Sequence, residues 1–141
     1  MKKIFISSDH AGYKLKEQIK KYLKTKNIIC FDLGPSSNKK VDYPIYAHKL
    51  AKKVKTSKKN VGILVCGSGT GMCITANKYK KIRAAQCFSL KSTKLSRLHN
   101  DANIITLGSR LLNKKNALNF VNVFLNTKFE GGRHLKRLKK I

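Results

Sequence analysis

Short apolar segments alternate along this chain with stretches whose apolar residues recur at helical spacing. The apolar segments lie near residues 3–7, 28–33, 61–66, 82–88 and 103–107. Each has the length of a buried strand, and each is followed by a helix-period stretch. This alternation predicts an α/β fold of three layers, α/β/α, in which helices cover both faces of a five-stranded parallel sheet.

Three of the predicted helices carry a single apolar stripe each, as expected for helices that pack on a sheet. The stripes are Leu15, Ile19, Tyr22 and Leu23 in the first helix, Ala47, Leu50, Ala51 and Val54 in the second, and Ala117, Val121, Phe124 and Leu125 in the fifth. No linker or repeat interrupts the pattern, so residues 1–141 are predicted to form one domain. Gly131-Gly132 should separate the body from a last basic helix at about 132–140.

The net charge of +26 raises the hypothesis of a nucleic-acid-binding module. The lysines, however, are scattered over every predicted helix and loop, without an arginine-rich block or a basic stripe interleaved with aromatic residues. A general bias toward lysine explains such a distribution better, and we expect no specific nucleic-acid partner. Binding whose affinity falls steeply with salt would indicate the alternative.

Compartment and membrane association follow from two further patterns. The chain has no run of 18 apolar residues, and Met1 leads directly into a strand-like segment, so we expect neither a membrane span nor a signal peptide. The four cysteines contain no C-x-x-C pair, which favours reduced thiols in the cytoplasm over disulfides or a zinc site.

The most informative motif is Cys66-Gly67-Ser68-Gly69-Thr70-Gly71, between a predicted strand and a predicted helix. Its glycines let backbone N–H groups approach an anion, and a cysteine at a helix start can have a pKa below the usual value of about 8.5. The motif lacks the acidic residue of a dinucleotide-binding loop and the lysine of a Walker A loop. A tight turn with an inert cysteine is the alternative.

Other reactive residues follow the remaining strands, where ligands bind in open parallel sheets. They are Asp9-His10, Asp42-Tyr43 and Gly108-Ser109-Arg110. Asp9 could instead be a helix cap, with His10 on the surface. A metal site of Asp9, His10, His99 and Asp101 is conceivable but lacks a ligand spacing, so no metal is expected.

His99-Asn100-Asp101 ends the fourth predicted helix, at the opposite edge of the sheet, and could serve a neighbouring subunit. His99 could also act only as a cation at a helix C-terminus. Arg133 and Arg137 are four residues apart and could clamp one phosphate, or belong to a solvated basic tail. His48 and His134 are interpreted as structural or solvated.

Together these segments resemble the type-B ribose-5-phosphate isomerases, in the family that also holds the galactose-6-phosphate isomerase subunits. The matching motifs, which span essentially the whole chain, are Ser8-Asp9-His10-Ala11-Gly12, Asp42-Tyr43-Pro44, Cys66 to Gly71, Ala76-Asn77-Lys78, Ser96-Arg97-Leu98-His99-Asn100-Asp101, Gly108-Ser109-Arg110 and Glu130-Gly131-Gly132-Arg133-His134. The resemblance implies a Rossmann-like sheet with strand order 2-1-3-5-4. It also implies a homodimer or dimer of dimers with shared active sites.

The resemblance further implies cofactor-free interconversion of D-ribose 5-phosphate and D-ribulose 5-phosphate in the non-oxidative pentose phosphate pathway. Cys66 would be the base of a cis-enediolate mechanism, and His99 would assist ring opening. The remaining implied contacts are Gly67, Ser68, Gly69, Thr70 and Gly71 for the oxyanion, Asp9 and Tyr43 for the sugar, and His10, Arg110, Arg133 and Arg137 for the phosphate, while Asn100 would line the site. A hexose-6-phosphate isomerase of the galactose type is the nearest alternative.

The glycine-rich loop indicates which branch of the family the chain resembles, and it departs from the usual pattern at one position. One branch of the family uses a glutamate downstream of the loop as its base, but residues 71–76 contain no carboxylate, which leaves Cys66 as the candidate. Ser68 stands where threonine is common, a change that keeps the hydroxyl and loses a methyl group.

Overall fold

The computed structural model describes residues 1–141 and contains five strands that alternate with five helices, followed by a sixth helix. In chain order these are β1 (Ile4–Ser8), α1 (Tyr13–Thr25), β2 (Cys30–Asp32), α2 (Tyr43–Val54), β3 (Val61–Cys66), α3 (Thr70–Ala76), β4 (Ala84–Gln86), α4 (Leu90–Asn100), β5 (Ile104–Gly108), α5 (Lys114–Asn126) and α6 (Arg133–Leu138). No helix is both long and apolar enough to cross a membrane.

All strand pairs are parallel, and the sheet order is β2-β1-β3-β5-β4, which confirms the order implied by the resemblance. The central strand β3 pairs with β1 on one side and β5 on the other, and all six of its residues are buried. The edge strands β2 and β4 have three residues each and are shorter than predicted. Each has a neighbour on one side only, so fewer hydrogen bonds hold it extended.

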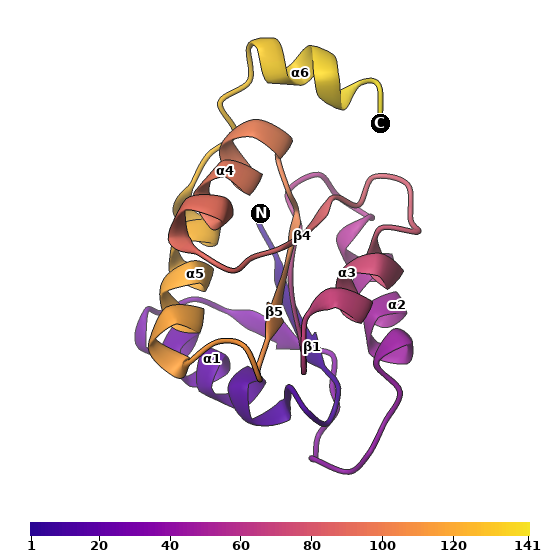
Figure 1. Cartoon of the computed structure of the whole chain (residues 1–141), viewed down its shortest axis with the longest axis vertical. Coiled ribbons are helices and arrows are strands. Elements are labelled where there is room, and N and C mark those ends of the chain that lie inside the picture. The colour runs from indigo at the N-terminus through magenta and orange to yellow at the C-terminus, as the bar shows by residue number, and fades with distance from the viewer.

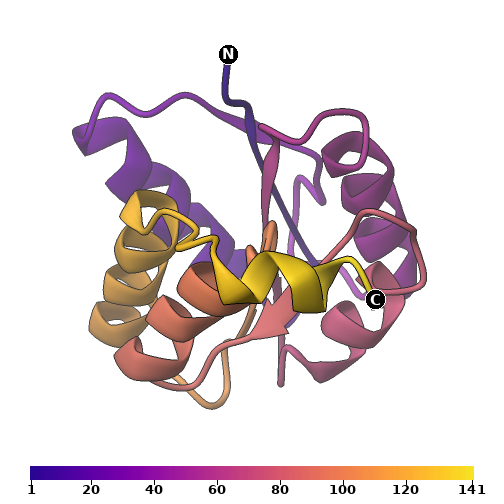
Figure 2. The ribbon, with the colours of Figure 1, turned by 90° about the horizontal axis from the view of Figure 1, so that it is seen from above.

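Helices cover both faces of the sheet, as predicted (Figures 1 and 2). One hydrophobic cluster joins α1 and α5 to the sheet, and the other joins α2 and α3 to the opposite face. The predicted stripes form these clusters, with Tyr22 and Leu125 packed at the margin. Burying one such side chain contributes roughly 1.5–3 kcal/mol.

Three of the helices begin at residues that favour a helix start. The Ser89 hydroxyl accepts a hydrogen bond from the Ser92 N–H and begins α4 with a capping box. The Asn113 side chain accepts one from the Asn116 N–H at the start of α5. Pro44 lies in the first turn of α2, where its missing N–H removes no helical hydrogen bond.

The two edges of the sheet present different residues. Cys66 is the last residue of β3, so it lies at the carboxyl edge. Helix α4 ends at Asn100, four residues before β5 begins at Ile104, so its last turn lies at the amino edge. Helix α6 lies beyond the same end of the molecule, above α4 in Figure 1. It spans six residues, a shorter helix than the predicted 132–140.

Candidate active site

The glycine-rich loop folds back over the end of β3 and holds the Cys66 thiol. The Gly69 N–H donates a hydrogen bond to Cys66 Sγ across 3.0 Å. Gly69 has a φ of 80°, a left-handed conformation that glycine adopts without steric penalty. A Cβ there would lie 3.0 Å from the Leu107 carbonyl carbon, so the loop packs tightly on β5. The thiol is therefore presented with a backbone donor already directed at its sulfur.

Two side chains lie directly against the glycines of this loop. A Cβ at Gly67 would lie 2.8 Å from Arg110 Nη1, and one at Gly71 would lie 2.5 Å from the Tyr43 ring. The Arg110 N–H also donates to the Gly67 carbonyl across 3.0 Å. Glycine is thus required at both positions for the guanidinium and the phenol to approach the loop.

A pocket of about 400 Å³ opens beside the thiol. It is lined by Asp9, Tyr43, Cys66, Gly67, Ser68, Gly71, Arg110 and Leu111. The pocket combines a thiol, a carboxylate, a phenol and a guanidinium, a set that suits a small polar anion. Leu111 has no chemical function in this set, and sequence analysis did not select it.

Asp9 both caps the start of α1, as the sequence suggested, and lines the pocket. Its Oδ1 accepts a hydrogen bond from the Gly12 N–H across 2.9 Å, just before α1 begins. Its side chain is buried at the carboxyl end of β1. The two interpretations are therefore compatible, because the cap holds the carboxylate in the pocket wall.

Gln86 supports the loop and was missed by sequence analysis. Its Nε2 donates to the Ser68 carbonyl across 2.7 Å and to Thr70 Oγ1 across 2.9 Å. The Thr70 hydroxyl is thereby turned toward Gln86, and neither Thr70 nor Gly69 lines the pocket. Gln86 ends β4, so the same rule that selected residues after the other strands could have found it.

His10 is half-buried beside the pocket without lining it. The Val41 N–H donates to its Nδ1 across 3.2 Å, which ties the ring to the segment that leads into α2. This contact fixes the ring and leaves Nε2 as the nitrogen available to a ligand.

His99, Asn100, Arg133 and Arg137 do not join Cys66 within one chain. They lie at the amino edge, on the last turn of α4 and on α6, and both arginines are exposed. This separation agrees with the predicted placement of His99 at the opposite edge. The metal site considered from the sequence does not form, because its residues lie at both edges of the sheet: Asp9 and His10 at one, His99 and Asp101 at the other.

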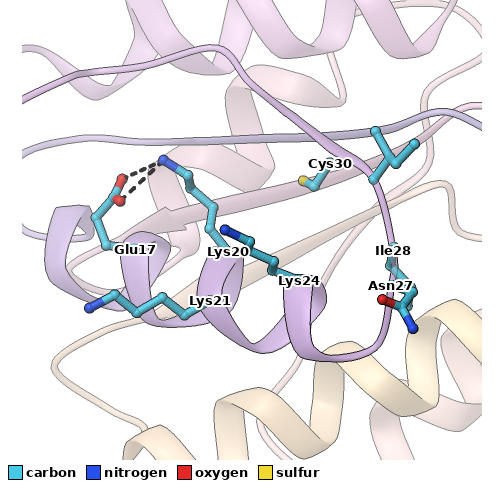
Figure 3. Close-up of a pocket in the computed structure, with 8 residues that line it drawn as sticks. Glu17, Lys20, Lys21, Lys24, Asn27, Ile28 and Cys30 are labelled. Carbon is cyan, nitrogen blue, oxygen red and sulfur yellow. Dashed lines mark hydrogen bonds and ion pairs between the residues drawn. The ribbon is translucent and has the colours of Figure 1, made fainter.

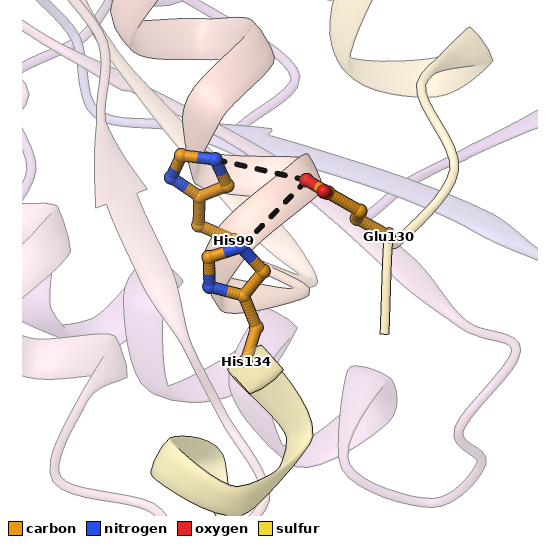
Figure 4. A group of neighbouring side chains, drawn as sticks. All are labelled: His99, Glu130 and His134. Atoms are coloured by element: carbon orange, nitrogen blue, oxygen red, sulfur yellow. Dashed lines mark ion pairs between the residues drawn. The ribbon is translucent and has the colours of Figure 1, made fainter. Parts of the chain in front are cut away.

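The structure instead gathers His99, Glu130 and His134 (Figure 4). The two imidazole rings stack with centroids 4.2 Å apart and planes inclined by 16°. Lone pairs lie in the ring planes, so those of nearly parallel rings cannot converge on one ion at about 2.1 Å. This arrangement does not fit a metal ion. Of the two interpretations of His134, structural or solvated, the second is wrong, since its side chain is only 5% exposed.

A larger hollow of about 590 Å³ lies between α1 and β2 and lacks comparable chemistry (Figure 3). Lys20 is already paired there with Glu17 and Asp32, at 2.9 Å and 2.6 Å. Burial raises the pKa of Cys30 to about 12, so its thiol is inert near neutral pH. Burial also raises the pKa of Cys73 and of Cys87. The smaller pocket at Cys66 is therefore the candidate active site.

Known proteins resemble this chain over nearly its full length. Residues 4–141 match the family model described as Ribose/Galactose Isomerase. Ribose-5-phosphate isomerase B of Escherichia coli is 40% identical, with 100% of this chain and 95% of the relative covered.

Solved structures agree with this match. That of Clostridium thermocellum ribose-5-phosphate isomerase B has a TM-score of 0.95 at 44% identity, covering 98% of this chain and 93% of the other. A second solved structure is that of ribose-5-phosphate isomerase B from Mycoplasma genitalium with bound ribulose-5-phosphate. It has a TM-score of 0.94 at 45% identity, covering 98% of this chain and 92% of the other. The chain belongs to the ribose/galactose isomerase family.

Proposed function

We propose that this protein is an aldose–ketose isomerase that interconverts D-ribose 5-phosphate and D-ribulose 5-phosphate. The observation that carries the proposal is the Cys66 thiol, which accepts the Gly69 N–H in a pocket that Arg110 also lines. A base, a donor for developing negative charge and a handle for phosphate are the groups that enediolate chemistry requires. The Mycoplasma genitalium relative with bound ribulose-5-phosphate supports the choice of substrate.

In this mechanism the Cys66 thiolate removes the proton from C2 of the open-chain aldose. The electron pair forms the C1–C2 double bond of a cis-enediolate, and the carbonyl oxygen at C1 takes up the negative charge. Backbone N–H groups of residues 67–71 stabilise this oxyanion. Transfer of the O2 proton to O1 and return of the proton from Sγ to C1 complete the ketose. The cycle is redox-neutral overall and needs no external oxidant or reductant.

Asp9 and Tyr43 would contact the sugar hydroxyls, and Arg110 and His10 would hold the phosphate. This division follows from chemistry, because a carboxylate and a phenol bind hydroxyl groups whereas a guanidinium binds phosphate bidentately. Binding of the distant phosphate orients the reacting carbons and so contributes to the rate. No metal or cofactor has a part in the scheme.

We assign His99, Asn100, Arg133 and Arg137 to the active site of a second copy, in a homodimer or a dimer of dimers. The support is their position at the amino edge, across the sheet from Cys66. Mixing Cys66→Ala chains with His99→Asn chains should restore part of the activity, because one of the two sites in a mixed dimer then has both groups. Verified mixed dimers without activity would contradict the shared site.

A substrate panel tests the assignment directly. Ribose 5-phosphate, ribulose 5-phosphate and hexose 6-phosphates are assayed side by side, and we expect the highest kcat/KM for the pentoses. Turnover of a galactose-type hexose phosphate without pentose turnover would overturn the proposal.

The free cysteines fit a reducing compartment. We therefore assign the reaction to the cytoplasm and to the non-oxidative pentose phosphate pathway.

A further inference from the structure

The segment between α5 and α6 folds back onto the end of α4. The Glu130 N–H donates to the Leu98 carbonyl across 3.0 Å, which gives a partner to a carbonyl in the last turn of that helix. Gly131 and Gly132, with φ of 72° and 53°, then turn the chain into α6. This path brings the Glu130 carboxylate and the His134 ring to the same place on α4, beside His99 (Figure 4).

The end of α4 that carries His99 is itself firmly held. Arg83 Nη2 lies 3.0 Å from one carboxylate oxygen of Asp101, and Arg97 Nη1 lies 2.9 Å from the other. The Arg83 side chain also donates to the Asp101 carbonyl across 2.8 Å. Contacts from Arg83, the residue before β4, and from Arg97 of α4 thus fix the backbone next to His99, so the remaining freedom belongs to the histidine side chain.

His134 is the one buried residue of α6, and its ring stacks on that of His99. Its Nε2 is buried without a hydrogen-bond partner and lies 3.6 Å from Glu130 Oε2. A buried nitrogen without a partner is unfavourable, because it has lost its hydrogen bonds to water. The same carboxylate oxygen lies 3.8 Å from Nε2 of His99.

Charge around the stack favours an uncharged His134. Burial of the ring lowers the pKa of His134, and His99 on α4 with Arg133 and Arg137 on its own helix act in the same direction, while Glu130 opposes them. Two imidazolium rings 4.2 Å apart would repel each other. Glu130 is the carboxylate that faces both rings.

We propose that His134 and Glu130 are positioning residues for His99: the His134 ring fixes the plane of the His99 imidazole, and Glu130 stabilises the charge that this imidazole carries when it holds a proton. The inference rests on the proposed role of His99 as the acid and base of sugar-ring opening. Opening breaks the bond between C1 and the ring oxygen, adds a proton to that oxygen and removes one from the hydroxyl on C1.

The two substrates separate this step from the chemistry at Cys66. Ribose 5-phosphate is mostly a closed ring and must open before it reacts. Ribulose 5-phosphate cannot close a five-membered ring, because the oxygen it would need carries the phosphate. Exchange of its C1 proton with deuterium from D₂O therefore requires the base but no ring opening.

The test measures both reactions in His134→Ala. We expect kcat for ribose 5-phosphate to fall about 10- to 100-fold, with KM changed less than about 3-fold, because misplacing a catalytic group by about 1 Å has this effect. Exchange at C1 of ribulose 5-phosphate should stay within about 2-fold of wild type. His134→Phe keeps a ring in the stack and should recover most of the lost kcat. Lys136→Ala, an exposed change on the same helix, is the matched control and should alter neither reaction.

Glu130→Gln gives an independent measurement, because the side chain is 55% exposed and the substitution should leave the fold intact. We expect the acidic limb of the kcat/KM profile for ribose 5-phosphate to move to lower pH, while Glu130→Asp keeps the wild-type profile. Equal losses of turnover and C1 exchange in His134→Ala, or unchanged kinetics in both His134→Ala and Glu130→Gln, would overturn the inference. Failure of the proposed function looks different, since the wild-type protein would then show no C1 exchange at all.

Discussion

Gly71→Ala should displace the Tyr43 ring from the active site while leaving the fold intact. The new Cβ would lie 2.5 Å from the ring, whereas ordinary contacts begin near 3.4 Å, so the ring must move by at least about 0.9 Å. The ring can move, because Tyr43 is 40% exposed. Gly71 lies within α3, where alanine gains roughly 0.5–1 kcal/mol over glycine, which offsets the cost of moving the ring.

The expected result is a fall in kcat/KM of about 10- to 100-fold, since a displacement near 1 Å disrupts the alignment of a reacting group. The midpoint of thermal unfolding should change by less than about 4 °C. Tyr43→Phe gives the loss due to the hydroxyl alone, and the double variant should lose little more than Gly71→Ala, because both changes act on one contact.

Gly12→Ala is the matched contrast for this experiment. A Cβ at Gly12 would lie 2.3 Å from the Val65 carbonyl oxygen, a backbone atom that cannot swing away. That variant should lose stability, whereas Gly71→Ala should lose activity. Wild-type kcat/KM in a folded Gly71→Ala protein would remove Tyr43 from the site and refute the reasoning.

Four further predictions concern the base, its reactivity, the phosphate and the buried ion pair. Cys66→Ala should lose 10²- to 10⁴-fold in isomerisation, the range typical of a general base, and still bind sugar phosphate; full activity would exclude the thiol mechanism. Iodoacetamide should alkylate Cys66 first and substrate should protect it, because burial raises the pKa of the other three thiols, as mass spectrometry of the labelled peptides would show. Arg137→Ala should raise KM strongly and lower kcat less, and steady-state kinetics identical to wild type would place the side chain outside the site. Asp32→Asn should destabilise by about 1.5–3 kcal/mol, because the fully buried Lys16 ammonium loses its 2.7 Å charged partner and keeps only one other, the Glu17 carboxylate at 3.1 Å. Burial tends to raise the pKa of Asp32, but the hydrogen bonds from Lys16 and Lys20 outweigh it and lower the pKa. The wild-type advantage should therefore be present at pH 7 and shrink as pH falls below about 4, the pKa of an unfolded aspartate. Chemical denaturation at several pH values would measure it, and a gap independent of pH would contradict the assignment.

Much of this architecture was predictable because its causes are local. Alternation of apolar segments with helical stripes identifies strands and helices, and burial of both faces of β3 follows from its continuous apolar sequence. The rule that ligands bind beyond the carboxyl ends of parallel strands selected Asp9, Tyr43, Cys66 and Arg110, which line one pocket. The strand order came from the family resemblance, since periodicity carries no information on which strands are neighbours.

Only the tertiary structure decided which distant segments meet. The pattern around His134 is that of a solvated basic tail, yet the turn at Gly131 and Gly132 buries this ring against His99. Nothing local marks Tyr43 as the residue that lies over Gly71, or Gln86 as the support of Ser68. Such contacts depend on the paths of the crossover connections and on the packing of whole helices, which no short window of sequence contains.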